Sequence, residues 1–177
     1  MLIRQAQGYL DLVDACCEFC EPSPEVRDPL VYRALDALGR LGEADRRKPD
    51  VLFLTGQAFR AIQLYREAIA SLREAARIEP ENTHIWLALG WCYKRIGRLD
   101  RAIESLEEAL TVDPGGAIIH YNLACYWSLT GSADVALTYL GNALEIDASF
   151  RHLIDGETDF DAIREHPAFR ELTAVVV

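Results

Sequence analysis

Apolar and small residues recur along this chain at the three- and four-residue intervals typical of amphipathic helices. The pattern is clearest between Thr83 and Pro114, where it predicts two helices joined by a turn. The expected buried faces consist of Trp86, Leu89, Gly90 and Tyr93 in the first helix and of Ala102, Leu106 and Ala109 in the second. Because large residues alternate with small ones across the pair, the two helices can pack closely.

The same pattern recurs before and after this segment with a period of about 34 residues. The recurring positions are Gly56, Gly90 and Ala124; Phe59, Tyr93 and Trp127; Ala68, Ala102 and Ala136; Leu72, Leu106 and Leu140; Ala75, Ala109 and Ala143; and Pro80, Pro114 and Ala148. This period and these residues resemble the tetratricopeptide repeat (TPR). The resemblance implies an all-α fold, a right-handed α-solenoid of antiparallel helix pairs.

The resemblance also implies a division of the chain. Three repeat units are expected at 49–82, 83–116 and 117–150, preceded by a degenerate repeat or capping helices at 1–48 and followed by a capping segment at 151–177. The ends of a solenoid need such caps because the terminal repeats otherwise expose a hydrophobic face.

Residues expected at turns agree with this division. Gly97 and Gly131 lie where the two helices of the second and third units must be connected, and glycine suits a left-handed C-terminal cap. Gln63 holds this place in the first unit, so we expect a strained or differently built turn there. Pro80 and Pro114 are expected to end the second helices, because proline disfavours helix at the residue before it.

Helices are also expected outside the repeats. Leu2–Phe19 has the pattern of an amphipathic helix, and Asp28 before Pro29 is typical of a helix start, which predicts a second helix at Leu30–Arg46. In the tail, Asp159 is expected to cap a short helix. This tail, with its Asp-Phe-Asp and Pro-x-Phe elements, resembles the closing segment of bacterial TPR arrays.

Composition limits the partners. The net charge of −10 over 177 residues argues against broad phosphate binding, so we expect no nucleic acid partner. No apolar run approaches the roughly 20 residues that span a bilayer, so no membrane insertion is expected. The first residues include polar side chains throughout and acids at Asp11 and Asp14, so they do not resemble a signal peptide, which favours a cytoplasmic protein.

Candidate catalytic chemistry is sparse. The sequence contains no Gly-rich phosphate loop, no HExxH and no nucleophile motif, so we predict neither an enzyme nor a cofactor. Cys16, Cys17 and Cys20 form the most suggestive cluster, because Cys16 and Cys20 share a helix face and could supply two soft metal ligands. No second pair follows at zinc-finger spacing, so we expect no metal site, and a metal or redox sensor stays as an alternative.

In TPR proteins the first helices of the pairs line a concave groove that binds peptides. The resemblance implies a groove lined by Asp50, Phe53, Gln57 and Arg60 from the first unit, His84, Leu87, Trp91, Lys94 and Arg95 from the second, and Ile118, Tyr121, Cys125 and Ser128 from the third. Trp91 is not needed for packing within its pair, because Trp86 and Tyr93 fill those places, so it favours a binding surface. The alternative is that residues 1–20 or the C-terminal tail cover it.

The leading interpretation is therefore a non-enzymatic adaptor or assembly factor that binds a segment of another protein. Basic and aromatic groove residues favour an extended or helical segment with apolar anchors and acidic flanks. Self-association into a homo-oligomer is compatible with the sequence. A TPR chaperone for a secreted protein is a second interpretation, since the small acidic chaperones of type III secretion also carry three such repeats.

Overall fold

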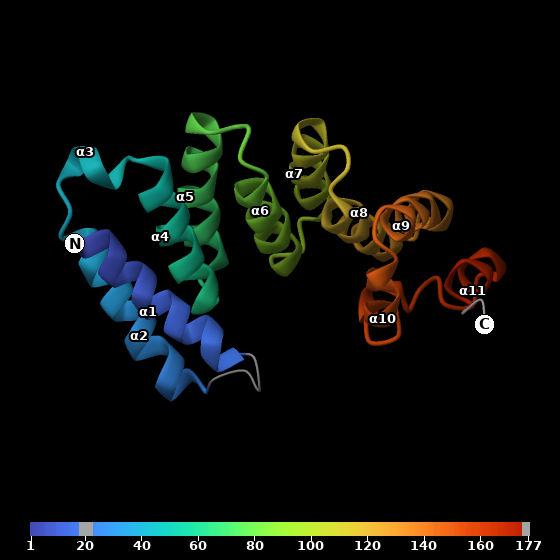
Figure 1. The fold of residues 1–177 in the computed structure, drawn as a ribbon, viewed down its shortest axis with the longest axis horizontal. Coiled ribbons are helices and arrows are strands. Elements are labelled where there is room, and N and C mark those ends of the chain that lie inside the picture. The colour runs from blue at the N-terminus through green and yellow to red at the C-terminus, as the bar shows by residue number, and fades with distance from the viewer. Residues whose placement is uncertain (18–22, 175–177) are drawn as a thin grey trace. The chain divides into compact units, whose positions relative to one another are not determined.

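The computed structural model describes residues 1–17 and 23–174, and their regular secondary structure is entirely helical (Figure 1). The all-α class and the pairing of successive helices are thereby confirmed. The chain forms two compact units, Met1–Ile96 and Gly97–Val177. The boundary falls at the turn inside the expected second repeat, so the compact units do not coincide with the repeats.

Unit 1, Met1–Ile96, consists of two helix pairs, a short helix that connects them and one further long helix. Its helices are α1 (Leu2–Cys17), α2 (Pro24–Gly39), α3 (Glu43–Arg46), α4 (Pro49–Ala61), α5 (Tyr65–Ile78) and α6 (Thr83–Arg95). Helices α1 and α2 pack together and against α4. Their shared core includes Leu10 from α1, Val31 from α2 and Val51 from α4, which are at most 6% exposed. The N-terminal pair therefore covers a hydrophobic face of α4.

A close approach between α4 and α5 explains the glycine at position 56. A Cβ atom at Gly56 would lie 2.6 Å from Cγ of Leu72, well inside van der Waals contact. Leu72 is fully buried on α5. A hydrogen atom at position 56 thus lets the leucine side chain fill the space between the helices.

The turns inside the helix pairs share one backbone conformation. Gly97 and Gly131 have φ angles of +75° and +80°, in the left-handed region. Gln63 adopts the same conformation with φ of +61°, so the first turn is built like the others but with a residue that has a Cβ atom. The Leu64 amide donates to the Phe59 carbonyl at 2.9 Å, as the Ser132 amide does to Trp127 at 3.1 Å.

Unit 2, Gly97–Val177, combines three long helices with a folded C-terminal segment. It contains α7 (Leu99–Val112), α8 (Ala117–Leu129), α9 (Ala133–Ile146), η1 (Ala148–Phe150), α10 (Arg151–Ile154), η2 (Thr158–Phe160) and α11 (Pro167–Thr173). Helix η2 packs on α8 and α11 packs on α9. Phe160 of η2 is the largest fully buried side chain among the residues that the structure describes.

Two predictions about helix boundaries are wrong. The second helix begins at Pro24 and contains Pro29, because the Ser23 carbonyl accepts bonds from the amides of Val26 and Arg27 and starts the helix earlier. It ends at Gly39, and the turn that follows separates it from α3. In the tail, Glu157 caps η2 by accepting from the Asp159 amide at 3.1 Å, so Asp159 lies inside that helix and does not cap it.

Candidate functional site

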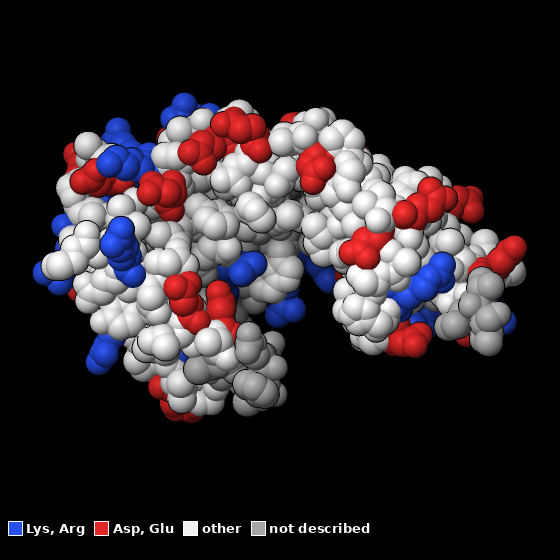
Figure 2. Space-filling model, in the orientation of Figure 1, with Lys and Arg blue, Asp and Glu red and all other residues white. Residues whose placement is uncertain are grey.

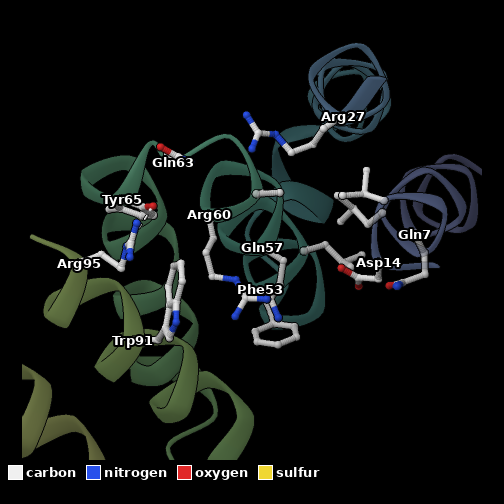
Figure 3. Close-up of a pocket in the computed structure, with 14 residues that line it drawn as sticks. Gln7, Asp14, Arg27, Phe53, Gln57, Arg60, Gln63, Tyr65, Trp91 and Arg95 are labelled. Carbon is white, nitrogen blue, oxygen red and sulfur yellow. Dashed lines mark hydrogen bonds between the residues drawn. The ribbon is translucent and has the colours of Figure 1, made fainter. Parts of the chain in front are cut away.

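A cavity of about 510 Å³ lies within unit 1 (Figure 3). Helices α1, α2, α4 and α6, together with the turn before α5 and its first residue, contribute to the walls. The lining residues are Gln7, Leu10, Val13, Asp14, Arg27, Phe53, Leu54, Gln57, Arg60, Ala61, Gln63, Tyr65, Trp91 and Arg95. Its size is that of a site for a few side chains or a small molecule.

Trp91 on α6 is the central aromatic side chain of this cavity. Its indole lies between the guanidinium groups of Arg60 and Arg95, whose carbon atoms are 5.3 Å and 5.5 Å from the ring centre (Figure 3). Tyr65 meets the same indole edge-on at 5.5 Å and accepts a hydrogen bond from Nε of Arg95 at 3.3 Å. Cation–π contacts of this kind hold the indole in place while 36% of the residue stays exposed.

The cavity carries more positive than negative side chains. Arg27, Arg60 and Arg95 face a single lining carboxylate, that of Asp14. Arg27 is paired with Asp28 at 2.8 Å, whereas Arg60 and Arg95 form no ion pair with any residue that the structure describes. The acidic chain therefore contains a locally basic site, although acidic and basic side chains are interspersed over the face of unit 1 that Figure 2 shows.

Two buried groups lie close to the cavity. The side-chain oxygen of Gln57 is buried and has no hydrogen-bond partner among the described residues, so a bound group or water could donate to it. Cys92, which follows Trp91 on α6, is fully buried. Burial raises the pKa of its thiol to about 11, and the cation of Arg60 opposes this shift. Cys92 is accordingly a packing residue at neutral pH.

Five of the residues predicted for the groove line this cavity: Phe53, Gln57, Arg60, Trp91 and Arg95. The other four from unit 1 do not. Asp50 and His84 lie near the starts of their helices, and Leu87 and Lys94 are half-buried outside the cavity.

Three of the four predicted groove residues of α8 need correction. Ile118 is exposed, but Tyr121, Cys125 and Ser128 are buried at 4%, 2% and 0% exposure. The C-terminal segment covers this face, since Tyr121 packs against Phe150 and Phe160 with ring centres 5.1 Å and 5.7 Å apart. These three side chains are therefore not accessible to a partner in this structure.

Sequence reasoning missed the wall that α1 provides. Gln7, Leu10, Val13 and Asp14 line the cavity although they lie outside the repeats. Their three- and four-residue spacing marks one helix face, but nothing in it indicates that part of this face borders a cavity. The cysteine cluster is the other candidate site predicted from sequence. Cys20 lies outside the described residues, as do the side chains of Cys16 and Cys17.

A polar contact between a ring nitrogen and a proline carbonyl occurs at equivalent positions of two successive repeats. The indole nitrogen of Trp86 donates to the Pro80 carbonyl at 2.7 Å, and Nε2 of His120 lies 2.9 Å from the Pro114 carbonyl. His120 is 7% exposed. It therefore has the packing position that the repeat assigns to it.

Comparison with known families gives a match over residues 63–121 to the tetratricopeptide repeat. The tetratricopeptide pattern is therefore present in residues 63–121. The match covers the second helix of the first unit, the whole second unit and the start of the third. No curated protein matches this sequence significantly.

Solved structures extend the TPR fold over most of the chain. A crystal structure of MamA is 22% identical with a TM-score of 0.70, covering 84% of this chain and 77% of MamA. A second MamA structure is 19% identical with a TM-score of 0.66, covering 96% and 92%. TTC0263, a thermophilic TPR protein from Thermus thermophilus, is 21% identical with a TM-score of 0.63, covering 92% and 97%. At these identities the similarity establishes the fold.

TPR repeats form a protein-interaction fold, which agrees with the class of function expected from the sequence. None of the described helices is both long enough and apolar enough to cross a bilayer.

Proposed function

We propose that this protein is a non-enzymatic adaptor that binds a segment of a partner protein in the cavity of unit 1. The observation that carries this proposal is the exposed Trp91 side chain, held between Arg60 and Arg95 at the wall of a preformed cavity. Tryptophan and arginine are enriched among the residues that dominate binding energies at protein interfaces.

The surroundings of Trp91 favour a particular kind of segment. An apolar side chain of the partner would bury against Trp91 and Phe53, which lie on different walls of the cavity. Aspartate or glutamate beside this anchor would pair with Arg60 and Arg95, which have no carboxylate partner among the described residues. The anchor would supply most of the affinity, and the charges would set orientation and association rate.

Panning a random peptide library on the purified protein tests this proposal directly. We expect the selected peptides to share an apolar anchor next to acidic residues. Trp91→Ala should weaken their binding by about 2 kcal/mol or more, the cost of losing an interface hot spot. Tyr32→Ala is the matched control, since Tyr32 is an aromatic residue of α2, 58% exposed, that does not line the cavity. Peptides that bind wild type and Trp91→Ala equally would refute the proposed site.

The charges are tested separately by Arg60→Glu, with Arg73→Glu on the exposed surface of α5 as control. We expect Arg60→Glu to weaken binding of the selected acidic peptides most at low salt, because ionic strength screens the attraction between opposite charges. Arg73→Glu makes the same change in net charge but should have a much smaller effect.

A further inference from the structure

Three potential metal ligands converge in unit 2, outside the cavity described above. The sulfur of Cys125 and one carboxylate oxygen each of Glu157 and Asp159 all lie within 4.8 Å of one another. Cys125 is 2% exposed, Asp159 is 7% exposed and Glu157 is half-buried. Two acidic residues and a thiol gathered inside a protein repel one another when ionised, so a cation between them would offset that cost.

A fourth polar group faces the same place. Tyr121 precedes Cys125 by one helical turn on α8 and is 4% exposed, yet its buried hydroxyl has no hydrogen-bond partner among the described residues. Its ring meets that of Phe160, the residue after Asp159, edge-on with ring centres 5.7 Å apart. Tyr121 is thus packed beside residues that carry ligand atoms, and its hydroxyl needs a partner that the described part of the protein does not provide.

The loop that carries the two carboxylates is fixed by other groups. Arg164 donates to the carbonyls of Asp155 and Glu157 at 3.3 Å and 2.7 Å, and its Nε pairs with Asp161 at 2.8 Å. Glu157 uses one carboxylate oxygen to accept from the Asp159 amide. The guanidinium of Arg164 is thus engaged by Asp161 and the backbone.

We propose that Cys125, Glu157 and Asp159 bind a divalent metal ion of the zinc type. One thiolate and two carboxylates are a donor set that suits Zn²⁺, with a water molecule in the fourth position that would hydrogen-bond to Tyr121. Binding requires the Cys125 thiol to release its proton to solvent, so affinity should rise with pH. The ion would tie the C-terminal segment to α8.

The test uses the full chain with Cys16, Cys17 and Cys20 replaced by serine, which removes the competing cysteine cluster. Zinc chloride is titrated by calorimetry, and Co²⁺ absorption reports thiolate ligation. We expect one equivalent of zinc to bind and to raise the melting temperature. Adding Cys125→Ser should abolish both effects, whereas adding Cys92→Ser, which changes the buried cysteine of unit 1, should leave both intact. Tyr121→Phe should weaken binding about 10-fold, as expected for a group beyond the direct ligands.

Circular dichroism without metal checks that each variant is folded. If Cys125→Ser fails to fold, Glu157→Gln decides the question, because Glu157 is half-buried and glutamine can still accept from the Asp159 amide. The proposal is overturned if the variant without the cluster binds no zinc, or if it binds zinc equally well after Cys125→Ser or Glu157→Gln.

Discussion

Trp91 and Cys125 occupy the same position of successive repeats, but in opposite environments. Trp91 is 36% exposed and borders an open cavity, whereas Cys125 is 2% exposed beneath the C-terminal segment. Both lie on the first helix of a pair, and both are among the residues predicted to line the groove.

The difference shows what a repeat determines and what its neighbours determine. The repeat sets which side of each helix a residue faces, since the spacing fixes the packing of the pair. The flanking segments decide whether that side is accessible. In unit 1 the flanking helix α1 forms one wall of the cavity, and in unit 2 η2 packs directly onto α8.

The largest expected effect on stability comes from weakening the packing of the C-terminal segment on α8. Phe160→Ala should reduce the free energy of unfolding of unit 2 by about 3–5 kcal/mol, because the ring is fully buried against Tyr121 and Phe169. Chemical denaturation followed by circular dichroism measures this change. Leu129→Ala, at an exposed position of α8, is the control and should have little effect. Equal stability of the two variants would mean that the cover contributes little.

A smaller effect on stability is expected when a glycine of unit 1 is replaced by the residue at the equivalent repeat position in unit 2. Gly56→Ala introduces the alanine found at the equivalent position two repeats later, Ala124, but its Cβ would meet Leu72 at 2.6 Å. We expect a loss of about 1–3 kcal/mol from overpacking, measured by denaturant unfolding. Gly141→Ala on α9 is the control, because its Cβ would meet nothing within 4 Å. It should stabilise by about 0.5–1 kcal/mol through helix propensity. A stabilising Gly56→Ala would contradict the close approach of α4 and α5.

The smallest expected effect concerns thiol accessibility, measured by alkylation and mass spectrometry in the variant lacking Cys16, Cys17 and Cys20. Phe160→Ala should speed alkylation of Cys125 at least about 10-fold, equivalent to roughly 1.4 kcal/mol in local opening. Cys92 should stay slow near pH 8, because burial raises its pKa to about 11. Since the folded-state pKa is raised, any stability that this shift contributes is present below pH 9 and is lost as pH rises towards 11. Equal acceleration at both cysteines would indicate global unfolding.

The fold could be predicted well where spacing alone determines it. The paired helices follow from the period of about 34 residues, and the turns at Gly97 and Gly131 follow from the conformation that glycine permits. The start of α2 was predicted at the wrong place, because Asp28 followed by Pro29 has the composition of the first turn of a helix. Proline inside a helix costs one hydrogen bond, and the earlier start at Ser23-Pro24 offsets that loss.

The candidate site was predictable only in part. Five residues of unit 1 followed from the repeat, since each faces the side that the groove of such proteins uses. The packing of the C-terminal segment over Tyr121 could not be predicted, because no periodicity relates residues 155–163 to α8. For the same reason, Cys125 and Glu157 could not be associated from sequence: they are joined only when the tail folds back.

The position of Trp91 also gives the protein an optical property. Its indole is partly exposed and stands between two cations at the edge of the cavity, while Trp86 and Trp127 are half-buried elsewhere. A segment entering the cavity would exclude water from the Trp91 ring and change the electric field across it. Occupancy of the cavity is therefore coupled to the emission of a native fluorophore, with no label attached to either molecule.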